Sequence, residues 1–143
     1  MERIGAELAA GRNWISLARY MELALYQPGL GYYAGGAAKL GVAGDFVTAP
    51  ELGALFGRTL ARQVAALLEP GAAILEFGAG SGALAAALLD ALPTGQPYLI
   101  VEASAELAAR QRERIGARAR WLERLPERFR GVVLANEVLD AMP

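Results

Sequence analysis

A short apolar run that leads directly into a glycine-rich turn constrains the fold of this 143-residue chain most strongly. Residues 73–77 (Ala-Ile-Leu-Glu-Phe) predict a buried strand, and residues 78–82 (Gly-Ala-Gly-Ser-Gly) follow it at once. A helix is predicted over residues 83–92, where Pro93 ends it. Glycines at a strand-to-helix turn permit positive φ angles and let a ligand approach the main chain closely. The segment therefore predicts a ligand-binding turn in an α/β fold.

The chain after this turn continues to alternate between strand and helix. Further strands are predicted at residues 98–101, 119–122 and 131–135, and a helix that Ser104 caps runs to about Ile115. This alternation is typical of a parallel, doubly wound sheet, and the nearly continuous apolar strands suit a sheet covered on both faces. We therefore predict a Rossmann-like half-domain over residues 71–143, whose first four strands are parallel.

The first 70 residues predict helices and a loop rich in glycine and tyrosine. An amphipathic helix is predicted from Ile15 to Tyr26, and residues 28–50 are predicted to be irregular. Thr48 and Glu51 have the spacing of a capping box, with Pro50 in the first turn. The helix they open is predicted to reach Leu68, with an apolar side made of Leu52, Leu55, Phe56, Leu60, Val64 and Leu67.

Composition limits the chemistry that this chain can perform. It contains no Cys and no His, which excludes disulfides, thiol catalysis, Ser-His-Asp triads and the usual zinc ligands. We predict no metal site. The net charge of −1 gives no reason to expect nucleic-acid binding. The N-terminus carries acidic residues and no apolar run of membrane length, so we expect no membrane insertion and a cytoplasmic location in a prokaryote.

Three polar positions at predicted strand ends indicate the class of ligand. Glu102 ends the second strand, where a carboxylate can accept two hydrogen bonds from a ribose diol. Glu76 lies two residues before the first glycine, and Asn136 and Glu137 end the fourth strand at the same edge of the sheet. Together these positions fit an adenosyl ligand with an amino-acid tail and no phosphates, which describes S-adenosyl-L-methionine.

Two alternatives remain open at this point. The spacing of Gly78, Gly80 and Ala83 also satisfies a relaxed dinucleotide fingerprint, which would indicate an NAD(P)-dependent oxidoreductase. That alternative leaves Glu76 and the Asn136-Glu137 ending unexplained. The other is a non-catalytic assembly module that binds a partner through the first helices and the loop of residues 31–46. The arginines of residues 110–120 predict a solvated face and are assigned no ligand.

Four stretches of the chain, in order, resemble the MidA-type S-adenosylmethionine-dependent methyltransferases. They are residues 20–33, with Tyr20, Tyr26, Tyr32 and Tyr33, then residues 44–51 (Gly-Asp-Phe-Val-Thr-Ala-Pro-Glu), residues 75–82 and residues 135–141. The resemblance implies a class I methyltransferase sheet and a protein substrate. Mitochondrial members of that family assist the assembly of respiratory complex I by dimethylating an arginine of one subunit. The resemblance therefore implies a protein arginine N-methyltransferase.

The predicted site divides into two sets of residues. Glu137, and less strongly Asp140, are expected to orient a guanidinium through charge-assisted hydrogen bonds. The expected cofactor-binding residues are Thr48, Pro50, Glu76, Gly78, Ala79, Gly80, Gly82, Glu102 and Asn136.

The length of the chain bears on what it can do alone. Members of the resembling family are more than twice as long, and residues 131–135 predict a central strand that would here form an exposed apolar edge. We expect a fragment or truncated product that binds cofactor poorly and is inactive alone. A homodimer that pairs these edges is the alternative.

Overall fold

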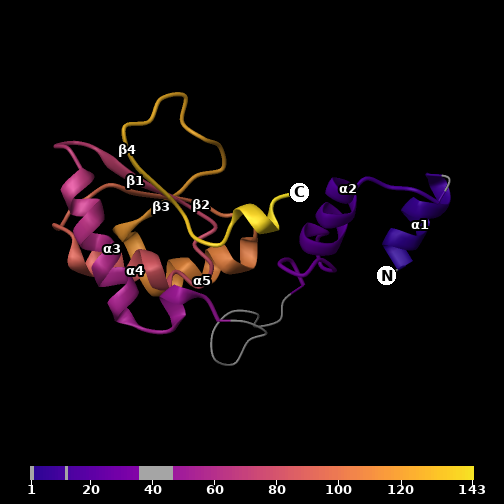
Figure 1. Ribbon diagram of the computed structural model, residues 1–143, viewed down its shortest axis with the longest axis horizontal. Coiled ribbons are helices and arrows are strands. Elements are labelled where there is room, and N and C mark those ends of the chain that lie inside the picture. The colour runs from indigo at the N-terminus through magenta and orange to yellow at the C-terminus, as the bar shows by residue number, and fades with distance from the viewer. Residues whose placement is uncertain (1, 12, 36–46) are drawn as a thin grey trace. The chain divides into compact units, whose positions relative to one another are not determined.

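The computed structural model of the chain describes residues 2–11, 13–35 and 47–143. The chain divides into two compact units, one made of residues 1–37 with 138–143 and the other of residues 38–137 (Figure 1). Residues 36–46 of the predicted irregular segment lie outside the described residues, and with them Gly44, Asp45 and Phe46 of one resembling stretch.

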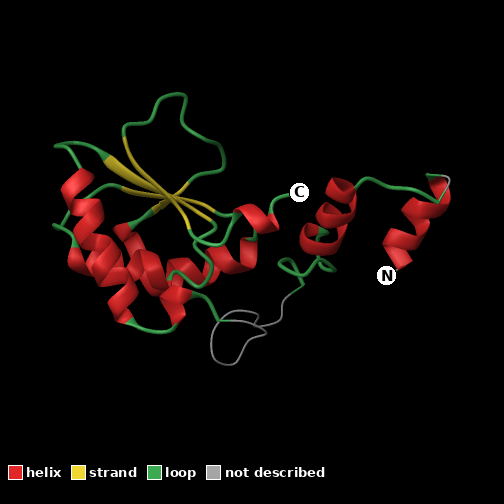
Figure 2. Cartoon of the chain, viewed as in Figure 1, coloured by secondary structure: helices red, strands yellow, loops and turns green. Residues whose placement is uncertain are grey.

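The larger unit is built on a four-stranded parallel sheet (Figure 2). The strands are β1 (Ala73–Phe77), β2 (Tyr98–Val101), β3 (Arg120–Trp121) and β4 (Gly131–Ala135), in the order β3-β2-β1-β4. The helices of this unit are α3 (Ala54–Leu67), α4 (Ala83–Ala91) and α5 (Ala105–Ile115), with a short 3-10 helix η3 (Gly116–Arg118) after α5. The predicted Rossmann-like fold is confirmed, because all three pairings are parallel and helices connect β1 to β2 and β2 to β3.

The hydrophobic core lies between the sheet and the layer of helices α3, α4 and α5, which gather on one side of it (Figure 1). Ile74, Tyr98 and Ile100 are buried on that face and pack with Leu84 and Leu88 of α4. Val133 of β4 points the other way and keeps 52% of its surface exposed. Leu75 of β1, level with Val133, is buried, so the described residues cover this second face in part.

The buried side of α3 differs from the predicted one. Val64 is buried and Leu60 packs against the core, as predicted, but Leu52, Leu55 and Leu67 are at least 69% exposed. Gly57 and Ala61 are buried in their place. A Cβ on Gly57 would stand 2.4 Å from the Cβ of Ala87 in α4, so small residues set the contact between α3 and α4. The prediction placed the large apolar residues on the buried side of α3, but the close packing of α3 on α4 requires small side chains there.

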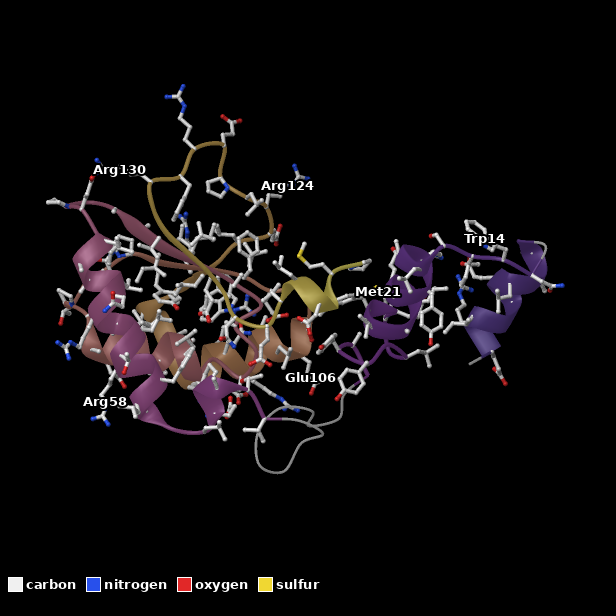
Figure 3. All side chains as sticks on the ribbon, in the orientation of Figure 1. Trp14, Met21, Arg58, Glu106, Arg124 and Arg130 are labelled. Carbon is white, nitrogen blue, oxygen red and sulfur yellow. The ribbon has the colours of Figure 1, made fainter. Side chains whose placement is uncertain are left out.

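The capping box predicted at Thr48 is also wrong. Thr48 precedes a separate 3-10 helix, η2 (Ala49–Glu51), and its side chain caps nothing. The helix α3 begins only at Ala54, after Gly53, and the Glu51 carboxylate instead accepts a hydrogen bond from Ser81. Arg58 of α3 projects into solvent (Figure 3).

The smaller unit contains α1 (Glu2–Ala10), α2 (Leu17–Met21), a π-helical turn η1 (Glu22–Tyr26) and η4 (Leu139–Ala141). The helix predicted over residues 15–26 is thus present, with Ser16 as its cap, whereas α1 was not predicted. Arg19 joins this helix to α1 through Glu7, and the Tyr26 hydroxyl donates to the carbonyl of Ala141 at 2.8 Å. The helix α3 packs on α4 and contributes to the core of the larger unit. The domain boundary predicted at residue 70 stays a prediction.

Candidate cofactor site at the carboxyl edge of the sheet

The parallel register brings the ends of three strands to one edge. Phe77 of β1 is level with Val101 of β2 and with Ala135 of β4. The next residues along the chain are Gly78, Glu102 and Asn136, so each predicted element of the site follows its strand at the same level. Ligands of open parallel sheets bind at this edge, beyond the carboxyl ends of the strands.

The glycine-rich turn adopts the conformation that its sequence predicts. Gly78, Gly80 and Gly82 have φ angles of 57°, 56° and 78°, in the left-handed region that disfavours side chains. A Cβ on Gly82 would also lie 3.2 Å from Ile115 of α5. The side chain of Ala79 is buried in the core, so only its main chain remains for a ligand. The turn thus places main chain without projecting side chains at the start of α4.

Ser81 ties this turn to η2 and to α5. Its hydroxyl donates to the Glu51 carboxylate, while Arg114 donates to the Ser81 hydroxyl at 2.8 Å and to its carbonyl at 3.1 Å. The 3-10 helix that contains Pro50 therefore lies against the turn, and Thr48 directly precedes it. Arg114 is exposed, as the predicted solvated face requires, and its guanidinium in addition contacts the turn.

The Glu102 carboxylate is half-buried and held by donors on both oxygens. Its Oε1 accepts from the amide of Ser104 at 3.0 Å, and its Oε2 accepts from Nε2 of Gln111 at 2.8 Å. Burial raises the pKa of Glu102, while these hydrogen bonds and the amides of Gly80 and Ala103 oppose that rise. These four donors match the roughly four lone-pair positions of a carboxylate, so the hydroxyls of a ribose would share or displace them on binding.

Glu76 lies deeper than the turn. Only 2% of its surface is exposed, and its Oε2 accepts a hydrogen bond from the Tyr98 hydroxyl at 2.8 Å. Burial raises the pKa of Glu76 to about 7, helped by the charge of Glu102 and opposed by the hydrogen bond from Tyr98. Burial and the neighbouring Glu76 also raise the pKa of Tyr98. The predicted contact of Glu76 with the amino group of a cofactor stays a prediction.

The end of β4 is more open. Asn136 Nδ2 donates to Glu137 Oε1 at 3.3 Å, and Glu137 is exposed. Glu137 has a φ angle of 53°, which is uncommon for a residue with a long side chain. Residues in such conformations cluster at functional sites. Asp140 is exposed in η4 and belongs to the smaller unit, and its predicted role beside Glu137 stays a prediction.

These features fit the group that the sequence predicts. Three positive-φ glycines open the main chain to a ligand, and a half-buried carboxylate stands at the end of the neighbouring strand. A diol on a ribose would be held by Glu102, and the amino-acid tail would lie against the turn. Among the described residues, no group of three acidic side chains could hold a metal ion, and no helix is long and apolar enough to span a membrane.

A family model described as "putative S-adenosyl-L-methionine-dependent methyltransferase" matches residues 55–143. The chain belongs to this family. The predicted cofactor is thereby confirmed as S-adenosyl-L-methionine at the level of the family, and family membership does not support the dinucleotide alternative. The matched segment contains the whole sheet and the glycine-rich turn.

Two curated relatives carry the same name. The chain is 35% identical over 112 residues to "Protein arginine methyltransferase NDUFAF7, mitochondrial" of Danio rerio, covering 69% of this chain and 26% of that protein. It is 36% identical over 80 residues to the Mus musculus protein of that name, covering 52% of this chain and 18% of the relative. The chain therefore spans about a quarter or less of the relatives it matches.

Among solved structures, one match is the mitomycin 7-O-methyltransferase MmcR. It is 31% identical with a TM-score of 0.44, over 59% of this chain and 27% of that chain.

The structure adds functional neighbours that sequence analysis missed. Tyr98, Gln111 and Arg114 contact Glu76, Gly80 and Ser81, which lie more than 20 residues away in the sequence. None of the three belongs to a recognisable sequence motif. The role of Gln111 could have been predicted from its position in the sequence. It falls on the same side of the predicted helix as Ala108 and Ile115, which is the buried side. A polar residue on a buried helical stripe requires partners.

Proposed function

We infer that this chain is the cofactor-binding part of a protein arginine N-methyltransferase linked to the assembly of respiratory complex I. The observation that carries the proposal is the convergence of the glycine turn, Glu102 and the Asn136-Glu137 ending at one edge of the sheet. The names of the two mitochondrial relatives supply the acceptor class. Because the chain spans a small part of those proteins, the activity, substrate and partner of the whole protein are all part of the proposal.

The residues present suit transfer of a methyl group to a nitrogen nucleophile. The cofactor, when bound, supplies the methyl group on a sulfonium, and displacement there depends mainly on alignment and exclusion of water. Glu102 and the turn would hold the adenosyl and amino-acid parts. Glu137, exposed beside the turn and in an unusual conformation, would orient the guanidinium through charge-assisted hydrogen bonds.

Arginine methylation of the respiratory complex tests this proposal. Complex I is isolated from cells with an intact gene for this chain and from cells in which that gene is inactivated, and its subunits are analysed by mass spectrometry. The proposal predicts an arginine that is dimethylated only when the gene is intact. A gene encoding Glu137→Gln should restore the amount of the protein and leave that arginine unmodified. Identical arginine methylation in all these cells would overturn the proposed substrate.

The assembly-module alternative predicts a different outcome. Assembly of the complex would then require the protein, whereas arginine methylation would not depend on Glu137 or on Gly80. A variant such as Gly80→Val, which alters only the cofactor turn, would then support normal assembly. A cytoplasmic location in a prokaryote remains part of the proposal and is tested by fractionating the same cells.

A further inference from the structure

One buried glutamine links the glycine turn after β1, the end of β2 and the strand β3. Gln111 lies in the second turn of α5 and is fully buried. Its Nε2 donates to the carbonyl of Gly80 at 2.9 Å and to Oε2 of Glu102 at 2.8 Å. Its Oε1 accepts from Nε1 of Trp121, on β3, at 2.8 Å.

These three partners fix the orientation of the amide. A carboxamide nitrogen has two hydrogens, and both are used by the two acceptors. The indole of Trp121 can only donate, so the amide oxygen must face it. Turning the amide over would set an oxygen against two acceptors and an N–H group against a donor, which are three unfavourable contacts in a buried place.

We propose that Gln111 is the positioning residue that orients the Glu102 carboxylate and the Gly80 peptide for the ribose and the amino-acid tail of the cofactor. This inference deepens the proposed function and rests on it. Trp121 anchors the amide from β3, so α5 acts as a rigid support for both binding elements. Rigid support of a binding group by a second layer of hydrogen bonds improves affinity because less ordering remains to be done on binding.

The geometry near Gly82 agrees with this role. A Cβ on Gly82 would lie 3.5 Å from Cα and Cγ of Gln111, so the glutamine packs directly against the turn it holds. Replacement of Gln111 by leucine keeps the volume and removes all three hydrogen bonds. Replacement by glutamate keeps an acceptor oxygen for Trp121 and removes the amide donor that faces Glu102.

The first test needs no ligand. The titration of the Glu102 carboxyl is followed by carbon-detected NMR in the chain and in Gln111→Leu. Loss of a donor to the carboxylate should raise the midpoint by at least about half a pH unit. The same leucine substitution at the exposed Gln63 of α3 is the matched control and should leave the midpoint unchanged. An unchanged midpoint in the Gln111 variant would overturn the proposed contact.

The second test separates positioning from general stability. Binding of S-adenosylhomocysteine and of its 2′,3′-dideoxyribose analogue is measured by NMR titration. Gln111→Leu and Gln111→Glu should each weaken binding of S-adenosylhomocysteine about tenfold, while affinity for the analogue without the diol falls only about threefold, because that analogue keeps the amino-acid tail but makes no diol contact with Glu102. Equal losses for both ligands would indicate a purely structural role and would overturn the proposal.

The two tests also distinguish this proposal from the proposed function. If the unmodified chain binds no S-adenosylhomocysteine, the cofactor part of the proposed function fails, and the Glu102 titration still decides whether Gln111 orients that carboxylate. If the Gln111→Leu variant does not fold, Gln111→Glu carries both readouts, because it retains the acceptor for Trp121.

Discussion

The ends of β1 and β2 differ sharply from the end of β4, although all three lie at one edge of the same sheet. At β1 and β2 the acidic groups are buried or half-buried, and Tyr98 and Gln111 donate to them. At β4, Asn136 and Glu137 contact each other at 3.3 Å, and Glu137 is open to solvent.

The difference shows which part of the site is held in place before any ligand binds. The side that would take the cofactor is fixed by protein hydrogen bonds, whereas the side assigned to the acceptor is still open. A network in which each buried polar group has a partner is rigid, and its loss is costly. The predictions below test whether the two regions respond as differently as their contacts suggest.

The largest effect on cofactor binding is expected for Gly80→Val, which alters the glycine turn on the side assigned to the cofactor. A β-branched residue at a φ angle of 56° is strained, and its side chain would project where a ligand meets the main chain. We expect binding of S-adenosylhomocysteine to become undetectable by NMR titration, a loss of more than about a hundredfold.

Gly95→Val is the matched control for this variant. Gly95 has a φ angle of 85° with open space around its Cβ position, and it lies in the turn between α4 and β2. Both variants therefore carry similar backbone strain. Equal loss of binding in the two would show that strain alone, and not the place of Gly80 in the turn, causes the effect.

The buried carboxyl of Glu76, on the side assigned to the cofactor, predicts that stability depends on pH. Because the pKa of Glu76 rises from its ordinary value of 4.5 to about 7 in the folded chain, the native state binds more protons than the unfolded state between these values. The free energy of unfolding should therefore fall as pH rises from about 4.5 to 7, by on the order of 2 to 3 kcal/mol. Denaturant unfolding at a series of pH values measures this slope.

Glu76→Gln should remove most of that slope while its amide oxygen still accepts from Tyr98. A smaller slope of the same sign should remain, since the pKa of Glu102 is raised in the same direction. Glu113→Gln, which removes the same charge from an exposed position of α5, should leave the slope as in the unmodified chain. The account of a buried, proton-binding Glu76 would fail if Glu76→Gln kept the full slope.

The smallest effect is expected on the open side. Glu137→Gln should change the affinity for S-adenosylhomocysteine less than about twofold, because this exposed carboxylate is assigned to the acceptor. Isothermal titration calorimetry measures the affinity. A tenfold loss would remove the contrast between the two regions and would move Glu137 to the cofactor side.

The sequence predicts the sheet well and the contacts around it poorly, for identifiable reasons. The strand at residues 73–77 and the turn of Gly78, Gly80 and Gly82 are local patterns, so their conformations follow from neighbouring residues. The same applies to Ser104, which caps α5 as predicted. These elements fix the parallel order that brings the site residues to one edge.

The predictions that failed depended on partners distant in sequence. Thr48 and Glu51 have capping-box spacing, yet Glu51 accepts from Ser81, thirty residues away. Leu55 appeared to belong to the core side of α3, but the close approach of Gly57 to Ala87 turns another side inward. A local pattern does not contain the competing tertiary contact that decides such positions.

Isothermal titration of the chain with S-adenosylhomocysteine, with NAD titrated in parallel, tests the central claim most directly. The account predicts saturable but weak binding of S-adenosylhomocysteine, with a Kd on the order of 100 μM, and no heat from NAD. Binding of NAD, or the absence of any response to S-adenosylhomocysteine at millimolar concentration, would contradict the assignment of this edge of the sheet to the methyltransferase cofactor.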